Sequence, residues 1–151
     1  MSLPVMGEGR PTPPRPAART MEWFVEAFLK AALVWLGAGV LLGLLFTVSP
    51  QQVVYRPAHA HINLLGFVSM MIFGVAYHVI PRFTGNALFS RRAAGWNWWI
   101  SNVGLVLLVA GFFMRPHAIG AAAPALAVGG TLAAAGAFIF ITNVWKTIDG
   151  N

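Results

Sequence analysis

The sequence predicts an all-α integral membrane protein, folded as a four-helix bundle with its N and C termini in the cytoplasm. Three observations predict this class. Apolar residues make up 58% of the chain and charged residues only 9%, which lies outside the range of soluble globular proteins. The apolar residues form four blocks, 21–48, 59–81, 94–114 and 119–145, each near the ~20 residues that cross ~30 Å of hydrocarbon. Positive charges gather on one side of these blocks.

The blocks divide the chain into three parts. Residues 1–20 hold five prolines and three arginines, so we expect a mobile cytoplasmic arm that meets lipid headgroups through its charge. Residues 21–146 form the transmembrane domain, and residues 147–151 form a cytoplasmic tail. Because the blocks use most of the chain, we expect any chemistry to lie within the bundle or at its rims.

Membrane topology explains the net charge of +6. Only Arg56 and Arg115 fall on one side of the blocks, while most cations fall on the other: Arg10, Arg15, Arg19, Arg82, Arg91, Arg92 and Lys146. By the positive-inside rule, the second side and both termini are cytoplasmic. The cations form no single stripe, so we expect membrane lipid and no nucleic acid as a partner.

Each helix carries its own packing or boundary signals. In the first, Gly39 and Gly43 are one turn apart and predict a close approach to another helix. Tryptophans near one end of the first, third and fourth helices favour a membrane interface there. Prolines mark boundaries and a bend: Pro50 and Pro57 before the second helix, Pro81 at its end, and Pro124 inside the fourth. The polar residues of the spans predict hydrogen bonds between helices, not a substrate path: Asn63, Asn97, Ser101, Asn102, Thr131 and Asn143.

The second helix begins with two histidines, His59 and His61, and an ionisable side chain inside a membrane is a functional candidate. Positions two apart on a helix are rotated by ~200° and differ in depth by ~3 Å, so these imidazoles point to opposite faces. This geometry suits two flat macrocycles better than one chelated ion. With no cysteine in the chain, thiolate metal sites, iron–sulfur clusters and covalently attached haem are excluded.

The run from Ala58 to Phe83 resembles the tenth helix of haem-copper oxidase subunit I, most closely that of the cytochrome cbb-type oxidases. It holds the paired histidines, a Leu-Gly-aromatic step one turn later, a Gly and a Tyr three residues apart, and a Pro-Arg stop. In that family the first histidine ligates the high-spin haem and the second the low-spin haem. The resemblance therefore implies that His59 and His61 bind haem iron.

Subunit I of that family has three arcs of four helices around a pseudo-threefold axis, and this chain resembles one arc. It lacks the second histidine-rich helix that builds the family's copper site, so the sequence does not support copper binding or complete oxygen reduction. We therefore expect a homo-oligomer with haem b between protomers. A trimer is favoured, and a dimer is the alternative.

Three more residues lie at the level of the pair. For His117, axial ligation, a haem propionate contact and an exposed loop position stay open. Arg56 and Arg115 are candidates to pair with propionates, which point outward in this family, and interfacial anchoring is the alternative for Arg56. His78 follows His61 by seventeen residues, about 25 Å along a helix, so we expect it to lie outside the same haem site.

Together these features predict a b-type cytochrome of the inner (plasma) membrane that transfers electrons with a respiratory-chain partner. One alternative is an open-site haem protein that binds or reduces oxygen or nitric oxide. The other is a haem-handling or assembly partner of a respiratory complex. The sequence assigns no catalytic residue.

Overall fold

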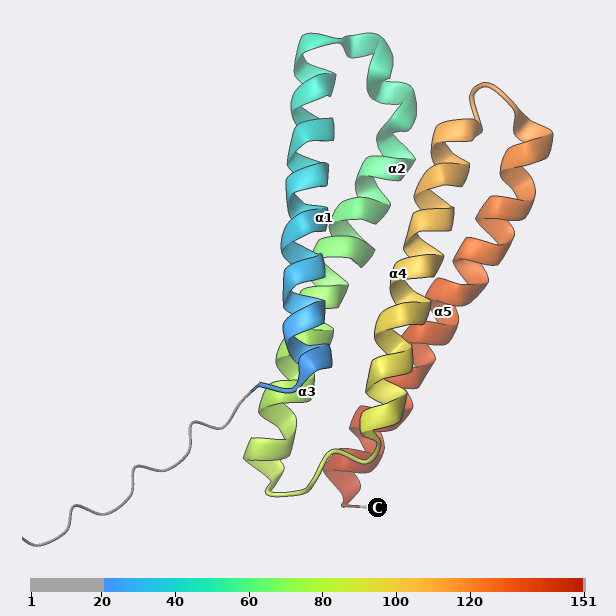
Figure 1. Ribbon diagram of the computed structural model, residues 1–151. Coiled ribbons are helices and arrows are strands. Elements are labelled where there is room, and N and C mark those ends of the chain that lie inside the picture. The colour runs from blue at the N-terminus through green and yellow to red at the C-terminus, as the bar shows by residue number, and fades with distance from the viewer. Residues whose placement is uncertain (1–20, 151) are drawn as a thin grey trace, which may run out of the picture.

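The computed structural model describes residues 21–150. These residues form four long helical rods that run alternately up and down, and no strand occurs in this range (Figure 1). Helix α1 spans Trp23–Val48. The second rod joins a 3₁₀ helix η1 (Pro50–Tyr55), α2 (Arg56–His61), a π-helix η2 (Ile62–Ser69) and α3 (Met70–Thr84). Helices α4 (Arg91–Met114) and α5 (Ile119–Asp149) complete the fold. All four rods are long and apolar enough to cross a membrane, which confirms the predicted all-α multi-pass architecture.

The two ends of the bundle carry different residues. At one end lie the turns from α1 to α2 and from α4 to α5, and at the other lie the turn from α3 to α4 and the end of α5 (Figure 1). We call the first the histidine end, after His59, His61 and His117, and the second the arginine end, after Arg91 at the start of α4. Which end faces the cytoplasm stays a prediction. The predicted arm 1–20 lies outside the described residues.

Helix boundaries differ from the predicted ones at several places. The second rod continues three residues past Pro81, to Thr84, and ends where Gly85 adopts a left-handed conformation with φ 73°, which only glycine adopts without strain. Its α-helical part begins at Arg56 rather than at position 59, because Pro57 occupies the first turn, where its missing N–H costs nothing. Helix α5 runs to Asp149 and takes in most of the predicted tail.

The larger of two core clusters lies toward the arginine end, and a smaller one of Leu42, Ala58 and Ile62 lies toward the histidine end. Phe24 and Phe28 of α1 are buried against Tyr77 of α3, with ring centroids 5.8 and 6.0 Å apart respectively. Phe140 of α5 lies 5.3 Å from the same tyrosine. Toward the histidine end α5 moves away from the second rod and keeps only α4 as a close neighbour (Figure 1).

Buried amides join the segments of the arginine end. Asn97, fully buried, donates to the hydroxyl of Tyr77 at 3.0 Å and accepts from Ser101 at 2.9 Å. The side-chain amide of Asn143 in α5 donates to the Ser90 carbonyl and accepts from the Ser90 backbone N–H, both at 2.9 Å. The predicted hydrogen bonds between segments are confirmed at these two positions and at Asn102 of α4, whose side-chain oxygen accepts from the indole N–H of Trp35 in α1 at 3.3 Å. Thr131 and Asn63 instead donate to carbonyls of their own rods, at Ala127 and His59.

Candidate functional site

His59 lies in α2 and faces α1. Its ring centroid is 5.4 Å from that of Phe46, and a Cβ placed on Gly43 would lie 3.0 Å from its Cε1. The missing side chain at Gly43 therefore lets the imidazole approach α1. The amide nitrogen of Asn63 donates to the His59 carbonyl at 2.8 Å and lies 3.4 Å from both ring nitrogens. Because its two distances to the ring are equal, this amide favours neither nitrogen.

His61 faces α4. Its ring lies 4.6 Å from that of Phe112, centroid to centroid, with an interplanar angle of 36°. Its Nδ1 is 2.8 Å from the carbonyl oxygen of Pro57, one turn earlier. Since a carbonyl only accepts, Nδ1 carries the hydrogen and Nε2 presents a lone pair. In a metal-binding histidine, the ring nitrogen that does not bind the metal usually donates its hydrogen to a carbonyl or carboxylate in this way.

The two imidazoles therefore diverge, as their spacing predicts. His59 turns to Gly43 and Phe46 on α1, and His61 turns to Phe112 on α4. Both side chains are half-buried. One short helix thus supplies an imidazole to each of two separate surroundings.

A π-helix begins directly after the pair, and sequence reasoning missed it. It spans Ile62–Ser69, and Ser69 donates its hydroxyl to the Leu64 carbonyl at 2.9 Å. Midway, a Cβ on Gly66 would meet Trp35 of α1 at 2.7 Å and Leu105 of α4 at 2.9 Å. The rod is thus tightly held between α1 and α4 just beyond the histidines. π-Helical turns occur frequently at functional sites, and no local residue preference marks this one.

His117 lies near the pair's end of the bundle but has a different neighbour. Its Nε2 is 2.8 Å from the hydroxyl of Tyr55 in η1, and the Tyr55 ring lies 4.8 Å from Phe113. This contact joins the two turns of the histidine end. Iron ligation through Nε2 of His117 would require the tyrosine hydrogen bond to break. The partnership with Tyr55 had no signal in the sequence, because 62 residues separate the two.

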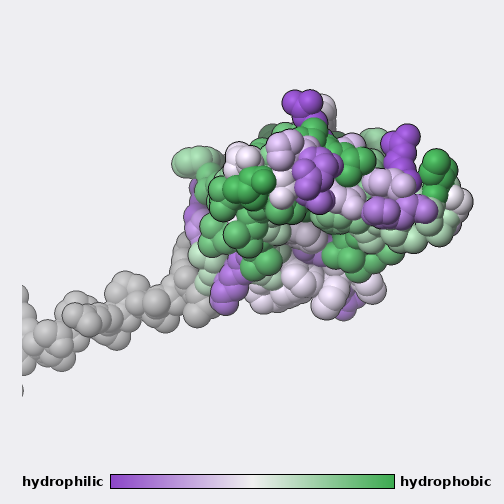
Figure 2. All heavy atoms as spheres, turned by 90° about the horizontal axis from the view of Figure 1, so that it is seen from above, coloured by the Kyte–Doolittle hydropathy of each residue, from purple (hydrophilic) through white to green (hydrophobic). Residues whose placement is uncertain are grey.

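Arg56 and Arg115 both lie exposed at the histidine end. Arg56 begins α2, three residues before His59, and Arg115 follows the last residue of α4. Figure 2 views this end and shows hydrophilic groups standing out among hydrophobic ones. The structure therefore keeps both guanidinium groups at the level of the imidazole pair, with their side chains accessible.

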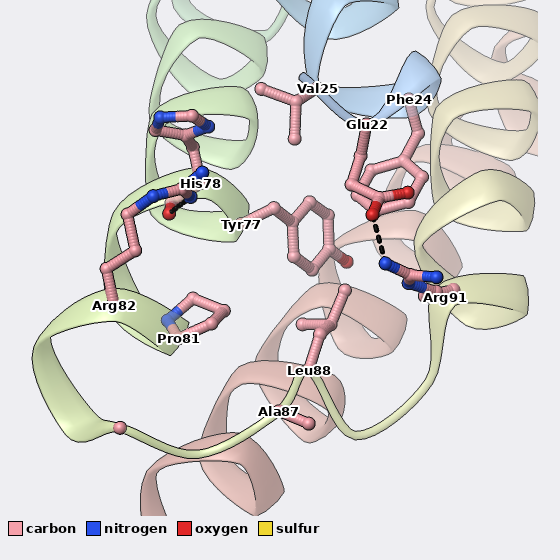
Figure 3. Close-up of a pocket in the computed structure, with 11 residues that line it drawn as sticks. Glu22, Phe24, Val25, Tyr77, His78, Pro81, Arg82, Ala87, Leu88 and Arg91 are labelled. Atoms are coloured by element: carbon pink, nitrogen blue, oxygen red, sulfur yellow. Dashed lines mark hydrogen bonds and ion pairs between the residues drawn. The ribbon is translucent and has the colours of Figure 1, made fainter. Parts of the chain in front are cut away.

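His78 lies at the opposite end, as its spacing from His61 predicts. It lines a cavity of about 700 Å³ together with Tyr77, Arg82 and, across the cavity, Glu22 paired with Arg91 (Figure 3). Arg82 donates to the carbonyl of His78. Sequence reasoning did not find this cavity, because its walls come from α1, α3 and the turn before α4.

The arrangement of donors limits what the histidine end can bind. Within residues 21–150, no group of three or more His, Cys, Asp or Glu side chains comes together to hold a metal ion. A bare ion would therefore find too few ligands on one chain. A metal already held in a macrocycle needs only one or two axial ligands, and single imidazoles with a free nitrogen fit that need. The donor set of this end thus fits haem.

No family model matches the chain, and no solved structure matches it. Curated relatives do. The chain is 28% identical to "Cytochrome c oxidase subunit 1" of Rhodobacter capsulatus over 60% of its own length and 22% of the relative's. It is 22% identical to "Cbb3-type cytochrome c oxidase subunit CcoN1" of Stutzerimonas stutzeri, over 81% of its length and 32% of the relative's. A 52-residue stretch is 35% identical to a "Cytochrome c oxidase subunit 1 homolog" of Azorhizobium caulinodans.

The chain is therefore similar to subunit 1 of the cytochrome c oxidases, the family that the histidine helix resembles. It spans about a fifth to a third of the length of these relatives. With four helices able to cross a membrane and this similarity, it is a multi-pass membrane protein.

Proposed function

We propose that this protein is a membrane b-type cytochrome in which His59 and His61 hold haem b and which transfers electrons. One observation carries the proposal: the two imidazoles leave one helical turn in different directions, His59 toward α1 and His61 toward α4. Similarity to oxidase subunit 1 supports the same conclusion.

The protein's own groups prepare each histidine for iron. The Pro57 carbonyl fixes the hydrogen of His61 on Nδ1 and leaves Nε2 as the donor atom. Phe112 limits rotation of the ring by lying against it. For His59, Gly43 makes room and Phe46 lies at the ring's side. When bound, the haem supplies one-electron redox chemistry.

A single chain offers one imidazole to each side of α2, so a haem with two protein ligands needs a second chain. We therefore propose a homo-oligomer with haem between protomers, His59 coming from one chain and His61 from the next. Because each contact joins unlike faces, repetition by a rotation that closes builds a ring, and a trimer is favoured with a dimer as the alternative. Native mass spectrometry should give an oligomer that carries haem. A haem-loaded monomer as the sole species would contradict the shared site.

The decisive experiment is spectroscopic. Protein purified from haem-replete cells should be red, with a pyridine haemochrome of haem b and a reduced spectrum of six-coordinate iron. His61→Ala and His59→Ala should each lose that spectrum, since each removes an iron ligand. His78→Ala is the matched control, because His78 lies at the other end of the bundle, and it should keep the full haem content. A colourless wild-type protein would sink the proposal.

A second candidate is an open-site haem protein that binds oxygen or nitric oxide. It rests on the same geometry, because a haem beside one chain alone would have one protein ligand and one open face. Carbon monoxide distinguishes the two candidates. A shift of the reduced spectrum indicates an open coordination site, and an unchanged spectrum indicates two protein ligands.

A further inference from the structure

A groove of about 630 Å³ lies at the arginine end between the start of α1 and the first turns of α4. Its walls are Trp23 of α1 and, from α4, Arg91, Arg92, Gly95, Trp96 and Trp99. A Cβ on Gly95 would lie 2.9 Å from the ring of Trp23, so the glycine lets this indole reach the wall of α4. The proposed haem function does not use this groove.

The lining combines two kinds of chemistry. Three indole rings provide an apolar wall, and they are 55% to 65% exposed, so the groove opens outward from the bundle. Two guanidinium groups line it, and among residues 21–150 no acidic residue does. Indole rings and arginines at the end of a membrane span lie where headgroups meet hydrocarbon. A ligand must therefore be apolar along most of its length and anionic at one end.

The neighbouring cavity has a different balance of charge. Glu22 lines it together with Arg82 and Arg91, and Glu22 pairs with Arg91 (Figure 3). This ion pair offsets part of the charge of Arg91. Within residues 21–150, Arg92 makes no ion pair, and its exposed side chain belongs to the groove. Because Arg91 lines both places, its ion pair affects both alike. Arg82 in the cavity donates to the carbonyl of His78, so Arg92 in the groove is the more available cation for an anion.

We propose that this groove binds one anionic phospholipid, with the phosphate on Arg92 and Arg91 and the acyl chains along the tryptophans. Lipid phosphates are recognised by basic residues at such membrane depths. The indole wall selects a lipid over a free phosphate ion, which has no apolar part. Binding of this lipid also joins α1 to α4 at the end where the two hairpins meet.

The test compares two lipids and two arginines on the detergent-purified full chain. Native mass spectrometry follows a titration with dioleoyl phosphatidylglycerol or dioleoyl phosphatidylcholine. We expect the first adduct to form at a several-fold lower concentration of phosphatidylglycerol. Arg92→Gln should weaken this adduct about fivefold, the effect of one cation near a lipid surface. Arg82→Gln removes the same charge at the same end but outside the groove, and it should change binding less than twofold.

A third variant separates the groove from its charge. Gly95→Leu keeps both arginines but pushes the Trp23 indole away from α4, because even its Cβ would lie 2.9 Å from that ring. It should therefore reduce the adduct while circular dichroism shows an intact helix content. Equal binding of the two lipids would overturn the proposal. So would equal losses in Arg82→Gln and Arg92→Gln, which would indicate unspecific attraction by the whole arginine end. Displacement of the lipid by millimolar inorganic phosphate would also overturn it, because it would make the site one for the free ion.

Discussion

The arginine end and the histidine end of the bundle are built in opposite ways. At the arginine end, Phe28 and Asn97 are fully buried, and aromatic rings and amides join α1, α3, α4 and α5. At the histidine end, the two imidazoles are half-buried, and the hydrogen bond between Tyr55 and His117 is exposed. The π-helix lies between these regions. The difference teaches that buried aromatic and polar contacts join the helices at the arginine end, while the histidines of the other end stay partly exposed.

Phe28→Ala should give the largest effect, on stability alone. Phe28 is 0% exposed and packs against Phe73 and Tyr77. Truncating it leaves a cavity and should lower the free energy of unfolding by about 3 kcal/mol or more. Unfolding by sodium dodecyl sulfate in mixed micelles measures it. The haem content of the folded fraction should stay that of the wild type. Loss of haem without loss of stability would contradict the division between the two ends.

Asn97→Ala should come next, lowering stability by about 1–3 kcal/mol because the buried hydroxyls of Tyr77 and Ser101 lose their partner. Thr131→Ala is the control. Its hydroxyl is exposed and bonds to its own helix, so the change should be within about 0.5 kcal/mol. The same micelle titration compares the two. Equal effects would mean that the buried hydrogen bonds of Asn97 contribute no more to stability than the exposed hydrogen bond of Thr131.

Gly43→Ala should change the histidine end with little change in stability. The new Cβ would lie 3.0 Å from Cε1 of His59, so the imidazole must move and the reduced spectrum or haem content should change. Gly37→Ala on the same helix has nothing within 4 Å of its new Cβ. It should keep the wild-type spectrum and gain up to about 1 kcal/mol from better helix propensity. Identical spectra for the two variants would contradict the proposal that His59 binds the haem.

Tyr55→Phe should give the smallest effect. It removes an exposed hydrogen bond to His117, which is worth about 1 kcal/mol or less. If His117 is no iron ligand, His117→Ala should match Tyr55→Phe in both stability and haem spectrum. A much larger spectral change in His117→Ala would instead make His117 a ligand, with Tyr55 as its hydrogen-bond partner.

Much of the fold could be predicted from the sequence, and particular residues show where the prediction failed. Gly39 and Gly43 predicted close approaches, and in the structure they face Asn63 and His59. The π-helix was missed, since no local residue preference marks it and tertiary packing around Gly66 accompanies it. Pro81 was read as a helix end, but it lies inside the last turn and Gly85 ends the helix.

The sequence by itself determined four apolar spans and a pair of histidines that diverge from one helix, because span length and side-chain rotation depend only on neighbouring residues. Tertiary structure alone decided that His59 meets α1, that His61 meets Phe112, and that His117 meets Tyr55. It also decided that α1 and α4 enclose a groove at the arginine end. These partners lie on segments far apart in the chain, so they depend on how whole helices pack, which no local pattern encodes.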